Sequence, residues 1–221
     1  MRCTVVRIFL CCVSMRNRFL LAFLLLLGSL LVFPLQPVLA QDAAPHAADH
    51  DLQFWDALSH SYYVQEGSRG SLIYLFLEPD CPYCHVLYNW LQNPVSTGKL
   101  RLRVVIIGFP NSPTSMGKAA AILGAKDPVQ ALKENEKGFA IRNGAPEGGI
   151  APASATLTQK QFGKLQRNFN FLAGKESLLD PQSVQQSGVS TPMLVYRSGK
   201  QVQYILGLPD HQQWQQIVDG S

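Results

Sequence analysis

Cysteine is scarce in this chain once the first 40 residues are set aside. Of five cysteines, Cys3, Cys11 and Cys12 lie in that leader, which leaves Cys81 and Cys84. A framework of several disulfides is therefore excluded. A bridge across two intervening residues closes too small a loop to constrain the unfolded chain much, so a purely structural bridge is a poor explanation for the pair.

An excess of positive charge is also missing beyond the leader. The whole chain has a formal net charge of +4, but 4 of its 19 lysines and arginines, and none of its 15 acidic residues, precede Gln41. The remainder therefore has 15 basic and 15 acidic side chains. No nucleic-acid partner is expected, because the phosphate backbone demands a basic surface.

An apolar run of ordinary membrane-spanning length is absent as well. The run Phe19–Phe33 is shorter than the roughly 20 residues that a span needs, and Pro34 and Pro37 follow it. With the basic segment before it, this run predicts a secretory signal peptide over residues 1–40, with Met15 as the expected start. The expected location is the periplasm, and an uncleaved leader that anchors the chain in the membrane is the alternative.

Two uniformly apolar segments predict the centre of an α/β domain. Ser71–Leu77 and Arg101–Phe109 are typical of buried strands. The segment between them, from Pro82 to about Pro94, predicts a helix, so the three elements form a parallel βαβ unit. Its expected buried face consists of Val86, Leu87, Trp90 and Leu91.

The flanking segments complete the expected organisation. Residues 41–70 are predicted to be a flexible lead-in and an amphipathic helix over Leu52–Tyr63, and residues 71–221 the domain itself. Within this domain, the pattern of residues 112–187 predicts a helical insertion. An antiparallel hairpin follows, with a turn at 198–200, and a last helix starts near Pro209.

The Cys81-Pro82-Tyr83-Cys84 motif is open to two functional interpretations. A zinc site would need two histidines, and His46 and His50 have suitable spacing, but they lie in the expected flexible lead-in. A redox couple follows from position, because Cys81 lies where the strand meets the helix. We therefore favour the redox couple and expect neither a metal nor another cofactor.

The strand-to-helix junction assigns different roles to the two cysteines. Unpaired N–H groups and the macrodipole at a helix start stabilise a thiolate at Cys81, and Pro82 suits the first turn. Cys84 should be more buried, so Cys81 attacks and Cys84 resolves the mixed disulfide. A pKa lowered by about three units from 8.5 would add about 45 mV of oxidising power at pH 7.

Neighbouring side chains are candidate modulators of this couple. Pro82 and Tyr83 determine which N–H groups face the sulfur of Cys81. His85 would favour the thiolate if charged, but an exposed histidine in the first helical turn is the simpler expectation. Glu78 would either relay a proton or solvate a loop, and we favour the second interpretation.

Several motifs in order resemble the DsbC/DsbG family of thiol–disulfide interchange proteins, and within it DsbG. They are WDALSHSYYVQEG, FLEPDCPYCHVLYNW, AAAILGAKDP, GVSTPMLVY and GLPDHQQW. The resemblance implies a thioredoxin fold with a helical insertion. It also implies that the Thr191–Pro192 peptide is cis and lies beside the cysteines, with both residues in contact with substrate, whereas the residues alone predict a trans bond. A backbone freed by such a turn could pair with an extended substrate segment.

The expected function is that of an exported thiol–disulfide oxidoreductase that acts on proteins with cysteines or disulfides and is recycled by a membrane or periplasmic redox partner. A holdase with a vestigial redox site is the alternative. Members of the family have an N-terminal dimerisation domain, for which the 40 residues between Gln41 and Cys81 leave no room. We therefore expect a monomer with weak isomerase activity.

Overall fold

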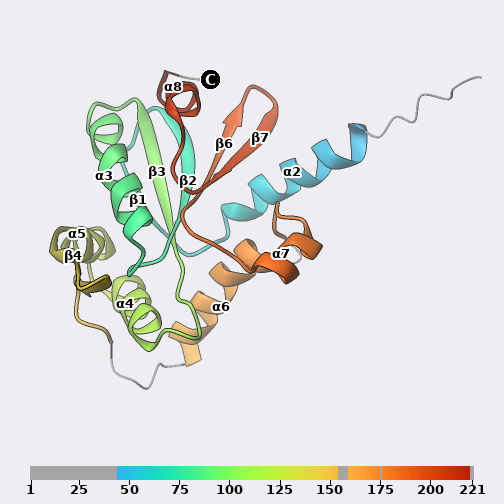
Figure 1. Cartoon of the computed structure of the whole chain (residues 1–221). Coiled ribbons are helices and arrows are strands. Elements are labelled where there is room, and N and C mark those ends of the chain that lie inside the picture. The colour runs from blue at the N-terminus through green and yellow to red at the C-terminus, as the bar shows by residue number, and fades with distance from the viewer. Residues whose placement is uncertain (1–43, 154–158, 175, 220–221) are drawn as a thin grey trace, which may run out of the picture. The chain divides into compact units, whose positions relative to one another are not determined.

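A computed structural model describes residues 44–153, 159–174 and 176–219 of the chain (Figure 1). These ranges belong to one compact unit, Ala43–Ser221. The predicted signal peptide, the expected start at Met15 and the first residues of the lead-in lie outside the described residues.

A five-stranded sheet forms the centre of this unit, with the order β1-β3-β2-β6-β7. Its strands are β1 (Tyr63–Glu66), β2 (Ser71–Leu77), β3 (Leu100–Ile106), β6 (Met193–Ser198) and β7 (Gln201–Leu206). β2 and β3 are parallel, and every other pairing is antiparallel. The predicted βαβ unit and the predicted C-terminal hairpin are therefore confirmed.

The central strands are buried on both faces. In β2, Ile73, Leu75 and Leu77 enter one apolar cluster, whereas Tyr74 and Phe76 enter another. Because successive side chains of a strand point to opposite faces, the two clusters lie on opposite sides of the sheet. Burial on both sides explains why the segment has almost no polar residue to mark its orientation.

Helices cover both faces of the sheet (Figure 1). The first cluster receives side chains from α3 (Pro82–Ser96), α4 (Pro113–Gly124), α5 (Pro128–Gly138) and α8 (His211–Asp219). The second receives Phe54 and Leu58 from α2 (Ala44–Leu58) and Phe171 from α6 (Gln159–Ala173). The short helix α7 (Pro181–Ser187) buries no residue.

The N-terminal helix differs from the prediction at both ends. It already begins at Ala44, inside the expected flexible lead-in, and it ends at Leu58 instead of continuing to Tyr63. Tyr63 instead starts β1, an edge strand that pairs with β3. A strand of four residues is too short to show a clear alternation, so no pattern in the sequence indicates β1. The sheet therefore begins before residue 71.

The insertion contains the predicted helices α4 to α7, but it is not purely helical. A hairpin of β4 (Phe139–Arg142) and β5 (Ala145–Gly148) follows α5. Asn143 and Gly144 at its turn both have positive φ, at 51° and 76°. An Asn-Gly pair is the sequence signature of such a turn, and it was the available signal for this hairpin.

The buried face of α3 also differs from the prediction. Leu87 and Leu91 are buried as expected, but Trp90 is 44% exposed. Its ring meets Trp214 of α8 edge-on, with 5.9 Å between centroids. Trp90 lies at the edge of the buried stripe formed by Leu87 and Leu91, and the sequence does not indicate how far the apolar neighbours that cover this stripe extend.

Asn168 fastens α6 of the insertion to the sheet. Its side-chain amide donates to the carbonyl oxygens of Tyr62 at 2.7 Å and Ile106 at 2.9 Å, and its Oδ1 accepts from the Tyr62 N–H at 2.8 Å. The side chain is fully buried. It therefore satisfies three backbone groups just beyond Tyr63 and Val105, the outermost pair of β1 and β3 at this end.

We predict that Asn168→Ala destabilises the fold by about 3 kcal/mol, because it leaves buried backbone groups unpaired. Urea unfolding of the reduced protein measures the change. Asn170→Ala is the matched control, since Asn170 lies on the same helix and its side-chain bond with Gln166 is exposed. The control should change stability by less than about 0.5 kcal/mol, and equal losses for the two variants would contradict the anchoring role.

Candidate active site

Cys81 is the N-cap residue of α3. Its Sγ accepts a hydrogen bond from the backbone N–H of Cys84 at 3.2 Å. In three helices of the insertion the same position is held by Ser112, Asp127 and Asp180, and each is followed by proline as Cys81 is. The sulfur thus occupies the place of a capping oxygen, at the positively polarised end of a helix.

Thr191 meets Cys81 from the other side of the site. The Cys81 Sγ lies 3.5 Å from the Thr191 carbonyl oxygen, to which the protonated thiol donates. The Thr191–Pro192 peptide is cis, as the family resemblance implied. Pro192 precedes β6, and its carbonyl accepts from the Gly207 N–H at 2.8 Å, which fixes this turn against the end of β7. The structure therefore brings together residues 110 positions apart.

Burial and pKa both distinguish the two thiols. Cys84 is fully buried, whereas Cys81 is half-buried, and neither is in a disulfide. The hydrogen bond from the Cys84 thiol, followed by that from its backbone N–H, lowers the pKa of Cys81 from 9.0 to about 7. Burial, together with the Cys81 thiol, raises the pKa of Cys84. The asymmetry has the direction expected for an attacking and a resolving cysteine.

The pKa of Cys81 falls less than the three units expected from the sequence. Its partial burial and the nearby charge of Glu78 both raise the pKa and so oppose the hydrogen bonds. A pKa of about 7 is close to that of the thioredoxin cysteine. The expected gain of about 45 mV in oxidising power, which assumed a pKa lowered by about three units, therefore loses its basis.

Glu78 is not the loop-solvating carboxylate that we favoured. It is buried, and its Oε1 accepts from the Asp80 N–H at 3.0 Å. Burial raises the pKa of its carboxyl group above the usual value, although hydrogen bonds from Ser115 and the Asp80 backbone oppose this. Its backbone carbonyl also accepts from the Cys81 N–H at 3.1 Å. Glu78 is thus part of the site.

His85 is likewise more constrained than expected. Its Nδ1 lies 3.0 Å from Oε2 of Glu136, a carboxylate that is buried on α5. Its ring stacks on Phe139 at 4.8 Å between centroids. Burial raises the pKa of the Glu136 carboxyl group. By contrast, Tyr83 is exposed beside the cysteines and Pro82 is exposed as well.

Three residues of the insertion that the sequence did not point to reach the site: Lys118, Asn135 and Glu136. The Lys118 ammonium donates to Asp80 Oδ1 and to the Gly148 carbonyl, both at 2.6 Å. The Asn135 amide donates to the Pro79 carbonyl at 3.1 Å and to Glu136 at 3.0 Å. The only sequence signal for Lys118 is a charged residue within the apolar segment of α4.

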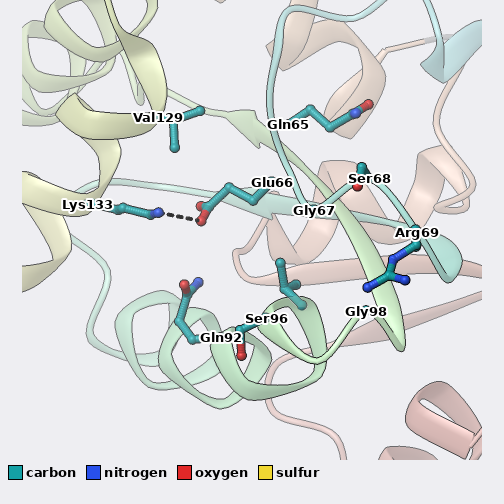
Figure 2. Close-up of a pocket in the computed structure, with 11 residues that line it drawn as sticks. Gln65, Glu66, Gly67, Ser68, Arg69, Gln92, Ser96, Gly98, Val129 and Lys133 are labelled. Atoms are coloured by element: carbon teal, nitrogen blue, oxygen red, sulfur yellow. Dashed lines mark ion pairs between the residues drawn. The ribbon is translucent and has the colours of Figure 1, made fainter.

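Figure 2 shows a separate pocket of about 430 Å³ that does not contain the cysteines. Gln92 and Ser96 of α3 line it, together with the turn at Gly67. Because an α-helix rises 1.5 Å per residue, Gln92 lies about 16 Å along α3 from Cys81. Inside the pocket, Lys133 Nζ points to Glu66 Oε2 at 3.6 Å.

The described residues contain neither a cluster of metal-ligating side chains nor a helix suited to span a membrane. No three histidine, cysteine or carboxylate side chains in this part of the chain are placed to hold a metal ion together. The side chain of His46, half of the histidine pair that we considered for zinc, is outside the described set. None of the helices from α2 onward is both long and apolar enough for a membrane span.

Comparison with known proteins finds relatives of one kind. No protein-family model matches the chain. It is 28% identical over 163 residues to the thiol:disulfide interchange protein DsbG of Escherichia coli K12, which covers 72% of this chain and 57% of the relative. It is 32% identical over 87 residues to DsbG of Pseudomonas aeruginosa, and this match covers 38% of this chain and 34% of the relative. The chain thus spans about half the relatives' length or less.

Solved structures show the same fold at lower identity. The catalytic domain of Proteus mirabilis ScsC matches with a TM-score of 0.52 and 18% identity, covering 78% of this chain and 96% of that domain. A periplasmic thioredoxin-like protein of Salmonella enterica serovar Typhimurium matches with a TM-score of 0.52 and 16% identity. This match covers 76% of this chain and 94% of that protein. The α/β thioredoxin fold is therefore confirmed, and so is the resemblance of this chain to the DsbC/DsbG family.

Proposed function

We propose that this chain is an exported thiol–disulfide oxidoreductase whose attacking residue is Cys81. The observation that supports it most directly is the capping position of the Cys81 sulfur, with Cys84 buried behind it. The names of the DsbG relatives support the reaction class. The predicted leader supports export to the periplasm.

The reaction follows from the different accessibility of the two thiols. The Cys81 thiolate attacks one sulfur of a substrate disulfide, the substrate S–S bond breaks, and the other substrate sulfur leaves as a thiolate. Cys84 then loses its proton and attacks Cys81, which releases the second substrate thiolate. Two electrons have passed to the substrate, and Cys81–Cys84 is now a disulfide. The reverse sequence oxidises a dithiol.

Substrate binding is proposed for the cis turn beside Cys81. The Thr191 carbonyl is within hydrogen-bonding range of the Cys81 sulfur, so an extended segment that pairs with the Thr191 backbone would bring its own sulfur to the same point. Recognition of this kind depends on the backbone of the substrate and not on its side chains. It therefore suits protein substrates of varied sequence, with a separate redox partner in the membrane or the periplasm.

A second candidate function, the binding of unfolded chains, rests on an aromatic surface in which Trp90 is exposed and Trp214 is partly buried. Trp90, Trp214, Pro209, Asp210 and His211 line a hollow of about 510 Å³ between α3 and α8. Exposed aromatic side chains at a concave surface favour contact with apolar segments. This activity would not need the cysteines, so the same variants distinguish the two functions.

We predict that Cys84→Ser accumulates mixed disulfides with other proteins, because the resolving thiol is missing, and that Cys81→Ser accumulates none. Non-reducing gels of the two variants, expressed with their leader, measure this. Cys81→Ser is the control with one thiol removed at the same site. Equal adduct formation by both would contradict the proposed roles. If the double serine variant still suppresses aggregation, it also binds unfolded chains.

The pKa of Cys81 is predicted to depend on the donor at position 84. Thiolate absorbance should titrate near pH 7 in the wild type, with no second thiolate until well above pH 9, because burial raises the pKa of Cys84. Cys84→Ser keeps a side-chain donor and Cys84→Ala does not. The Cys81 pKa should therefore be higher in the alanine variant, and identical values would exclude the side-chain hydrogen bond as its cause.

We also predict a monomer. The buried stripe of α2, Phe54 and Leu58, packs against the sheet of its own chain, and a helix of a few turns offers a small interface. Light scattering on residues 41–221 should give the mass of one chain, with clear dithiol–disulfide exchange and weak isomerase activity. A tight dimer with matching isomerase activity would contradict this prediction.

A further inference from the structure

Lys118 is a buried cation directly behind the thiol site. It is 4% exposed, and its ammonium group has two partners, the Asp80 carboxylate and the Gly148 carbonyl, each at 2.6 Å. Asp80 immediately precedes Cys81, and its side chain is only 10% exposed. An ion pair with so little exposure to water is poorly screened, so it acts on neighbouring charges more strongly than a surface pair.

Carboxyl groups outnumber cations around this ammonium. Glu78, Asp80 and Glu136 are all buried or nearly so, and the charge of Lys118 favours the ionised forms of Glu78 and Glu136. Among the described residues, the other titratable side chains around the site include Cys81 and Cys84 themselves, Tyr83 between them, and His85, which contacts Glu136. Negative charge beside Cys81 disfavours its thiolate, as the effect of Glu78 on Cys81 shows.

We propose that Lys118 is a positioning residue of the thiol site: it holds Asp80 in place and offsets the carboxyl groups that precede Cys81, and so sets the fraction of Cys81 present as reactive thiolate. This role rests on the proposed function of Cys81 and adds to it. It also explains why a lysine is buried in α4, where an apolar residue would pack at lower cost. The insertion thereby controls the reactivity of a cysteine on the thioredoxin core.

Two single substitutions separate this electrostatic role from a structural one. Lys118→Met leaves Asp80 without its cation, so the Cys81 pKa should rise by about one unit. Asp80→Asn leaves the cation without its anion, so the Cys81 pKa should fall. Both variants break the same ion pair, so a purely structural role would move the two values in the same direction.

The measurement is the rate of Cys81 alkylation by iodoacetamide as a function of pH, in a Cys84→Ser background. At pH 6 the rate should fall about tenfold in Lys118→Met and rise several-fold in Asp80→Asn. Lys118→Arg should restore most of the wild-type profile. The double variant Asp80→Asn/Lys118→Met, which removes both members of the ion pair together, should return close to the wild type and tests the idea even if a single variant folds poorly.

Lys133→Met is the matched control. Lys133 also pairs with a buried carboxylate, Glu66, but it is half exposed and lines the pocket at the far end of α3 (Figure 2). The pH dependence of Cys81 alkylation in Lys133→Met should match that of the wild type. Opposite shifts in the two single variants support the proposal, and unchanged or parallel shifts overturn it. If wild-type Cys81 shows neither a lowered pKa nor exchange, the proposed function itself fails instead.

Discussion

The hydrogen bond from the Cys84 N–H to the Cys81 sulfur is the interaction around which the site is built. It makes a thiol serve as the cap of α3, a role that serine and aspartate fill in three helices of the insertion. A cap needs a partial negative charge, and a thiolate meets that need better than a thiol does. The helix start therefore stabilises the reactive form of the cysteine, and the same turn supplies the resolving cysteine.

The surrounding structure holds this cap between two constraints. On the strand side, the buried strand β2 ends at Leu77. Glu78 then accepts hydrogen bonds from the Asp80 N–H through its side chain and from the Cys81 N–H through its carbonyl, which fixes the short connection to α3. From the side, the cis turn brings the Thr191 carbonyl to the sulfur. Cys81 is thus only partly exposed, whereas Tyr83, two residues further on, is exposed.

The insertion contributes a buried charged residue as well as helices that pack on the sheet. Asn168 fastens α6 to β1 and β3, and Asn135 reaches the Pro79 carbonyl just before the cysteines. Each is a fully buried amide that donates to backbone carbonyls distant in the sequence, so both fix the position of the insertion. Lys118 depends on that placement, because its two partners lie on the active-site loop and on β5.

Residues whose role depends on their immediate neighbours could be predicted from the sequence. Ser71–Leu77 is apolar after its first residue and proved to be β2, and the position of Cys81 before Pro82 indicated a helix start. Residues whose role depends on distant partners could not. Glu78 and His85 look like surface groups until Ser115 and Glu136 are placed against them, and nothing in the sequence pairs Lys118 with Asp80.

The measurement that tests the account most directly is the redox equilibrium of the cysteine pair. The protein would be equilibrated in glutathione or dithiothreitol buffers of known potential, quenched with acid, alkylated and weighed by mass spectrometry. Because the pKa of Cys81 is about 7, we predict one two-electron transition nearer to the potential of thioredoxin, about −270 mV, than to the about −120 mV of the strongest oxidants of this fold. A pair that forms no disulfide in any of these buffers, or a midpoint near about −120 mV, would contradict the account.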